Sequence, residues 1–170
     1  TAGAGPCVII GTNLKAPLGD AVFANSVAGH GLVREDMHTG SVSHFGIVVL
    51  PDRTTAVRID AIRQAIGDPH LRRIAPHITL IRPFNVADEQ LDEVLDAVRA
   101  AASHRESRPI GVTLGPPRVF DTSDTLYMAV DERGTERLTA LRELLRAGAM
   151  DLPEQYPQYV PHLTLARGVV

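Results

Sequence analysis

The heptapeptide Pro76–Arg82 (PHITLIR) returns as Pro161–Arg167 (PHLTLAR), 85 positions further along the chain. Five of the seven positions are identical, and the two that differ remain aliphatic. A repeat at this spacing indicates a duplicated structural unit in which each copy contributes one imidazole and one hydroxyl. Two facing histidines can divide the roles of an acid and a base. The repeat therefore favours an enzyme.

The flanking sequence repeats the same order of elements. Apolar periodicity predicts strand–helix–loop–strand twice, at 45–50, 54–66 and 77–81, and again at 125–130, 135–147 and 162–166. A further helix is predicted at 88–102, and strand pieces at 110–114 and 118–120. We therefore predict an α+β fold of two duplicated lobes, with antiparallel sheets around a central cleft and the helices outside.

Lobe 1 is predicted to span about 44–104 and lobe 2 about 105–170. Residues 1–43 hold half of the 14 glycines and show weak periodicity, with candidate strands at 7–11 and 21–27. This N-terminal extension is expected to be weakly structured or to supply an edge strand. The chain stops three residues past Arg167, so either a C-terminal element is missing from this sequence or the extension replaces it.

Three local features carry more detailed expectations. Val57, Ile59, Ile62 and Ile66 predict the buried stripe of the first helix, which Gly67 ends. The later helices are expected to bury Leu91, Val94, Leu95 and Val98, and then Leu138, Leu141, Leu144 and Leu145. Turns are predicted at 115–117 and 131–134.

Composition narrows the class of protein. Apolar residues make up 44% and charged residues 22%, as in ordinary soluble globular proteins. No apolar run is long enough to cross a membrane, and a secretory signal is not seen. The single cysteine, Cys7, favours the cytoplasm. A net charge of −3 argues against a broad nucleic-acid-binding surface but is compatible with a site for one phosphate.

The repeated motif suits a phosphodiester substrate. Residues two apart in a strand share a face, so His77 lies beside Thr79, and His162 lies beside Thr164. One neutral histidine can accept a proton from the attacking oxygen while the other, protonated, donates to the leaving oxygen. The threonine hydroxyls can donate to the non-bridging phosphate oxygens. No metal or cofactor is required.

Other residues are candidate substrate contacts. Arg82 and Arg167 occupy matching places five residues after each histidine, an odd offset that puts them on the opposite face unless the strand twists or bulges. Otherwise they cap strand ends or pair with carboxylates. Phe45 and Tyr159 are candidates to stack on a base, as are Phe84, Phe120 and Tyr127, although core positions are the usual use of such residues.

Two alternative chemistries find little support. His30 and His38, near Glu35 and Asp36, are spaced like no common zinc site, so no metal is predicted. Lys15 is the only lysine and lies outside the repeat, which argues against a ligase that adenylates lysine.

The paired motifs His77-Ile78-Thr79 and His162-Leu163-Thr164 resemble those of the 2H phosphoesterases, which include 2′-5′ RNA ligase-like proteins and cyclic phosphodiesterases. The resemblance spans roughly residues 43–167 and is closest to the small bacterial branch. It implies a bilobal fold, opening of 2′,3′-cyclic phosphates, and in some members formation or cleavage of 2′-5′ linkages.

We therefore predict a metal-independent phosphoesterase that acts on a nucleotide or RNA end. His77 and His162 are its catalytic residues, and Thr79 and Thr164 bind the phosphate. Two alternatives stay open: a module that binds RNA ends or a phosphorylated small molecule without turnover, and a structural partner that pairs through an exposed strand. The order of acid and base, the direction of reaction and the oligomeric state are not determined by the sequence.

Overall fold

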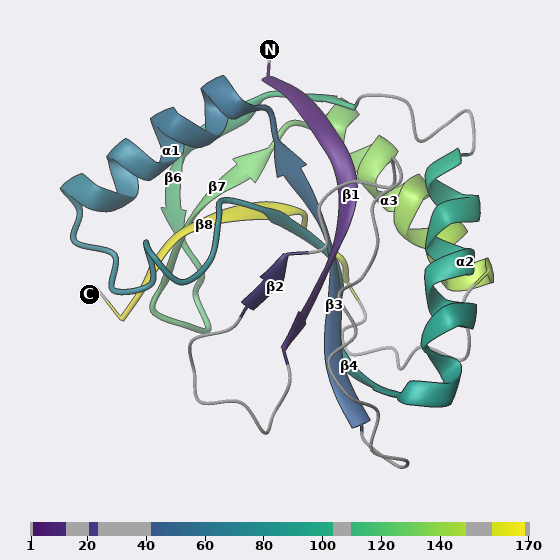
Figure 1. The fold of residues 1–170 in the computed structure, drawn as a ribbon. Helices are drawn as coiled ribbons and strands as arrows, with labels where there is room; N and C mark the ends of the chain where they lie inside the picture. The colour runs from purple at the N-terminus through teal and green to yellow at the C-terminus, as the bar shows by residue number, and fades with distance from the viewer. Residues whose placement is uncertain (1, 13–20, 24–41, 104–109, 149–157, 169–170) are drawn as a thin grey trace.

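The computed structural model describes residues 2–12, 21–23, 42–103, 110–148 and 158–168 (Figure 1). Its strands are β1 (Ala2–Thr12), β2 (Ala21–Phe23), β3 (Val42–Pro51), β4 (Ile78–Ala87), β5 (Gly111–Val112), β6 (Leu114–Val119), β7 (Thr125–Val130) and β8 (His162–Arg167). Its helices are α1 (Arg53–Ala65), α2 (Leu91–Ser103) and α3 (Glu132–Gly148), with a 3-10 turn at Asp88–Gln90. This mixture confirms the predicted α+β class.

The described strands form one sheet in the order β2-β1-β3-β4-β8-β7-β6, and β5 pairs with β1. All of these pairings are antiparallel. The two copies of the duplicated unit meet in the middle of the sheet, where Ile78 of β4 lies opposite Leu163 of β8. The repeated heptapeptides are therefore neighbours in space although they are far apart in sequence.

Each copy of the duplicated unit packs its helix against the strand of the other copy. Helix α1 precedes β4 in the chain but contacts β8, whereas α3 precedes β8 and contacts β4. Helix α2 packs beside α3, and the pair lies away from α1 (Figure 1). This exchange joins the two copies in one hydrophobic core. None of the described helices is long and apolar enough to cross a bilayer.

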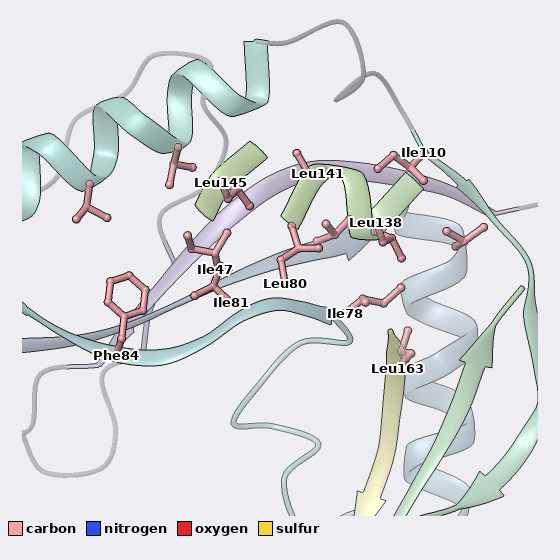
Figure 2. Close-up of a cluster of buried hydrophobic side chains, with 14 of the residues drawn as sticks. Ile47, Ile78, Leu80, Ile81, Phe84, Ile110, Leu138, Leu141, Leu145 and Leu163 are labelled. Carbon is pink, nitrogen blue, oxygen red and sulfur yellow. The ribbon is translucent and has the colours of Figure 1, made fainter. Parts of the chain in front are cut away.

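The core lies between the sheet and the helices. Leu138 and Leu141 of α3 lie over Ile78 and Leu80 of β4 (Figure 2). Burying a leucine or isoleucine side chain stabilises the fold by roughly 1.5–3 kcal/mol. The predicted inward faces of α2 and α3 are confirmed, because their residues are buried or packed against this core.

The predicted stripe of α1 is partly wrong. Val57 is 63% exposed and Ile62 is 38% exposed, whereas Ile59 and Arg63 are buried. A helical period of 3.6 residues puts positions 59, 63 and 66 on one face, so the arginine belongs to the buried side. The predicted end of the helix is confirmed, since Gly67 follows it with a φ of 73°.

The two predicted turns are wrong. Strand β6 runs through Gly115, Pro116 and Pro117, because it is an edge strand where a missing N–H is tolerated. Helix α3 begins at Glu132, inside the predicted break. A Cβ at Gly134 would lie 2.6 Å from Cγ1 of Val130, so glycine permits the close packing of this first turn.

Candidate active site

The pairing of β4 with β8 positions the two His-x-Thr motifs. The central residues Ile78 and Leu163 lie opposite one another and are 4% and 1% exposed. Both therefore point into the core. Their neighbours along the strands must point to the other face, because side chains alternate in a strand.

One further step of the same register pairs each histidine with a threonine. His77, directly before β4, comes opposite Thr164, and His162, the first residue of β8, comes opposite Thr79. Opposed residues in antiparallel strands have Cβ atoms about 4.5–5.5 Å apart. All four side chains are half-buried. The arrangement brings together two imidazoles and two hydroxyls, with each histidine beside the hydroxyl of the other copy.

Both imidazoles are held by the same backbone contact. Nδ1 of His77 lies 2.8 Å from the carbonyl oxygen of Ala75, and Nδ1 of His162 lies 2.8 Å from that of Val160. Because a carbonyl oxygen can only accept a hydrogen bond, Nδ1 carries the proton in both rings. Nε2 of each ring can then accept a hydrogen bond when the ring is neutral and donate one when it is protonated.

The site lowers the pKa of both histidines. Burial is the main cause in each case, and the hydrogen bond to the backbone carbonyl acts in the opposite direction. The positive charges of Arg63 and Arg167, and that of His162 when protonated, lower the pKa of His77 further. For His162 the charges are those of Arg167 and Arg82. Since a proton on one ring disfavours a proton on the other, the state with both rings protonated is disfavoured.

The two central strands each bulge at the same place in the motif. In its pairing with β3, strand β4 leaves Leu80 without an opposite residue. In its pairing with β7, strand β8 leaves Leu165 without one. A bulge sets two consecutive residues against one and so resets the alternation of side chains. Accordingly, Leu80 and Ile81 are both buried, as are Leu165 and Ala166.

The bulges meet the condition under which the matching arginines can share the face of the imidazoles. Strict alternation puts Arg82 and Arg167 on the face away from the imidazoles, but each follows a bulge and is exposed. Burial is the main cause of the lowered pKa of both histidines. The charge of Arg167 lowers both pKa values further, and the charge of Arg82 lowers that of His162. Both guanidinium groups therefore belong to the electrostatic surroundings of the motifs.

Two aromatic rings surround His162. Phe120 stacks on Tyr127 with ring centroids 3.9 Å apart and an interplanar angle of 15°. The centroid of His162 lies 4.9 Å from that of Phe120 and 5.4 Å from that of Tyr127, both in edge-on geometry. Tyr127 is also the β7 partner of Thr164, so it lies on the face of the motifs. These rings contribute to the burial that lowers the pKa of His162.

Two other aromatic candidates, Phe45 and Tyr159, make different contacts. Phe45 is half-buried and packs against the core. The Tyr159 hydroxyl donates to the carbonyl oxygen of Thr79 over 2.9 Å, and the guanidinium of Arg142 lies 5.0 Å from the centre of its ring. Tyr159 therefore connects the segment before His162 to the first motif.

The zinc interpretation concerned His30 and His38, and the lysine argument concerned Lys15; all three lie outside the described residues. Within the described ranges, no group of three or more His, Cys, Asp or Glu side chains is arranged to hold a metal ion.

The sequence pattern did not single out Arg63, because the isoleucines around it suggested an apolar stripe. A charged residue four positions after Ile59, on the buried face, was the available signal.

Paired central strands, each with a His-x-Thr motif and an imidazole oriented through Nδ1, are the arrangement expected of a 2H phosphoesterase. The chain belongs to the 2′-5′ RNA ligase superfamily, which it matches over residues 51–170. A Bacillus cereus (strain ATCC 10987) protein named "Putative phosphoesterase" is 32% identical over 125 residues, which cover 73% of this chain and 69% of the relative. Relatives of the same name in Bacillus thuringiensis (strain Al Hakam) and Bacillus anthracis (strain CDC 684) are 31% identical over the same coverage.

Proposed function

We propose that the protein is a metal-independent phosphoesterase that opens 2′,3′-cyclic phosphates, or cleaves or forms 2′-5′ phosphodiester linkages, in nucleotides or at RNA ends. The observation that carries the proposal is the crossed arrangement of the motifs. Each histidine lies opposite the threonine of the other copy, and each ring has Nε2 as its acid–base atom. Membership of a phosphoesterase superfamily supports an enzyme.

Hydrolysis of a 2′,3′-cyclic phosphate needs two proton transfers. Nε2 of the neutral histidine takes a proton from water while the water oxygen forms a bond to phosphorus. The bond from phosphorus to one ribose oxygen breaks, and that oxygen receives the proton from Nε2 of the protonated histidine. The product is a phosphomonoester, and the two histidines have exchanged protonation states. With a ribose hydroxyl in place of water, the same groups serve a 2′-5′ linkage.

The hydroxyls and guanidinium groups stabilise charge on the phosphate. Thr79 and Thr164 lie beside the imidazoles on the same face, where their hydroxyls can donate to non-bridging oxygens. Arg82 and Arg167, placed after the bulges, add positive charge near the phosphate. A single phosphate group fits this set better than a long nucleic acid, since the chain carries a net charge of −3. Cytoplasmic location stays a prediction from the single cysteine.

A product assay tests the proposal. The protein is incubated with 2′,3′-cyclic nucleotides and short 2′-5′ oligonucleotides in the presence of EDTA, and the products are separated by chromatography. We expect phosphomonoester from at least one substrate, and a severe loss in His77→Ala and in His162→Ala. His70→Ala is the matched control, because the backbone of His70, not its ring, makes the described hydrogen bonds.

The same assay separates the proposal from the binding alternative. Binding of a substrate by the wild-type protein without product after long incubation would favour a module that holds RNA ends. Full activity in either histidine variant would contradict two-histidine catalysis.

A further inference from the structure

Arg63 of α1 is a buried arginine that the proposed mechanism does not use. It is 3% exposed. Its Nε donates to Oδ2 of Asp68 over 2.8 Å, and its Nη1 donates to Oδ1 of Asp60 over 2.9 Å. Burying a guanidinium group costs free energy unless it is paired and hydrogen-bonded, and the two carboxylates meet that need.

The same guanidinium group binds the backbone of the loop between α1 and β4. Nη1 donates to the carbonyl oxygen of Ile74 over 2.9 Å, and Nη2 donates to that of His70 over 3.3 Å. Asp68 also accepts a hydrogen bond from the backbone N–H of His70 over 3.0 Å. These contacts hold the loop in one conformation up to the first motif.

The loop ends at the residues that orient His77. Ile74, whose carbonyl is bound by Arg63, is followed by Ala75, whose carbonyl accepts the hydrogen bond from Nδ1 of His77. Pro76, next in the chain, is buried and has a φ restricted by its ring. Only two residues, Ala75 and Pro76, separate Ile74 from His77.

The second copy has a different contact at the equivalent position. Tyr159 precedes His162 by three residues, as Ile74 precedes His77, and its hydroxyl donates to the carbonyl oxygen of Thr79. Burial raises the pKa of Tyr159, so the hydroxyl stays neutral. The segment before the first histidine is therefore bound by a charged group, and the segment before the second is anchored through a neutral one.

We propose that Arg63 is a positioning residue for His77: by binding the Ile74 carbonyl it fixes the Ala75 carbonyl, which sets the His77 tautomer and leaves Nε2 available for proton transfer. The role rests on the proposed function, because positioning matters for catalysis only if His77 exchanges protons with a substrate. The charge of Arg63 acts on the same ring. Burial is the main cause that lowers the pKa of His77, and Arg63 adds to it together with Arg167 and protonated His162.

His162 serves as an internal reference for this proposal. Among the described residues, the charges that lower its pKa after burial are those of Arg167 and Arg82. Loss of Arg63 should therefore affect one histidine of the pair, whereas general loosening of the fold would affect both.

The test uses Arg63→Gln and Arg63→Lys in the full chain. The Cε1–H signals of His77 and His162 are followed by NMR over a pH titration, which needs no substrate, and kcat and KM are measured on the substrate found in the product assay. We expect Arg63→Gln to raise the pKa of His77, leave that of His162 unchanged, and reduce kcat by on the order of 100-fold with little change in KM. Arg63→Lys should keep the pKa of His77 low but still reduce kcat, since it retains the charge and loses the forked contact.

Arg99→Gln is the control, because it removes an exposed ion pair with Asp96 on α2 and should change neither titration. If Arg63→Gln does not fold, Asp68→Asn weakens the same contact but keeps the charge of Arg63, so it should reduce kcat as Arg63→Lys does, without raising the pKa of His77. An unchanged His77 titration and unchanged kcat in a folded variant would overturn the proposal. A shift of both histidines by equal amounts would also overturn it. Absence of turnover in the wild-type protein would instead contradict the proposed function, and the NMR titration distinguishes the two failures.

Discussion

The two halves of the site share a backbone geometry and differ in what surrounds it. In both, Nδ1 of the histidine donates to the carbonyl two residues earlier, and a bulge follows three residues after the ring. The charge of the buried Arg63 acts on His77, whereas the rings of Phe120 and Tyr127 lie beside His162. The shared geometry is what acid–base chemistry requires of each histidine, and the different neighbours give each ring its own electrostatic environment.

The histidines themselves carry the largest expected effect. His77→Ala and His162→Ala should each reduce kcat by about 10²–10⁴-fold, the usual contribution of a general acid or base. Turnover is measured under saturating substrate, with circular dichroism to show that the variants fold. A small loss in one half and a large loss in the other would show that the halves are not equivalent partners.

Replacing the threonines should cause the next largest loss of activity. Thr79→Val and Thr164→Val keep the shape of the side chain and remove the hydroxyl, so kcat should fall by about 10²–10³-fold if the hydroxyl stabilises charge on the phosphate. The backbone carbonyl of Thr79 remains to accept from Tyr159, so valine leaves that contact in place. Kinetics on both variants would reject this role if the rates equal that of the wild type.

Removing Arg82 or Arg167 should change the pKa values of the two histidines differently. A nearby positive charge disfavours the protonated imidazole, so removing it raises the pKa. Arg167→Gln should raise the pKa of both His77 and His162, and Arg82→Gln should raise that of His162, with the acid limb of the kcat/KM profile moving to higher pH. NMR titration of the two rings checks this. Equal effects of both variants on His77 would contradict the assignment.

The aromatic rings beside His162 should affect the pKa of that histidine and not the pKa of His77. Phe120→Leu removes an edge-on contact and exposes His162, so the pKa of His162 should rise while that of His77 stays constant. The contact itself is worth about 0.5–1.5 kcal/mol of stability. Tyr127→Phe keeps the ring and serves as the control. A titration of His162 that is the same in Phe120→Leu and wild type would exclude the rings as a cause of its low pKa.

The smallest effect is expected from Tyr159→Phe. The variant loses one neutral hydrogen bond to Thr79 but keeps the ring beside Arg142. The free energy of unfolding should fall by about 0.5–1.5 kcal/mol, as measured by denaturant titration. A much larger loss would mean that this contact holds the second half as firmly as Arg63 holds the first.

The repeated heptapeptide indicated the four residues of this candidate site, because identical short strings in apolar strands fix which side chains share a face. The α+β class and the faces of α2 and α3 followed from apolar periodicity. The bulges did not follow, since Leu80 and Leu165 look like ordinary alternating residues and the extra residue appears only in the register with the neighbouring strand. The positions of Arg82 and Arg167 depend on those bulges.

The remaining errors come from tertiary context overriding local signals. Prolines 116 and 117 read as a turn, yet they fit an edge strand that has a partner on one side. Helix periodicity places Arg63 on the buried face with Ile59 but does not reveal its role, because the Asp68 carboxylate and the Ile74 carbonyl that it contacts come from the loop that follows α1. Such contacts are visible only when the loop conformation is known.

The central claim is that the two halves act as one acid–base pair, and a comparison of single and double variants tests it most directly. Turnover of a 2′,3′-cyclic nucleotide in EDTA is measured for wild type, His77→Ala, His162→Ala and the double variant. Because both histidines serve the same turnover, we predict that each single variant loses most of the activity and the double variant loses little more. Wild-type turnover in either single variant would contradict the account.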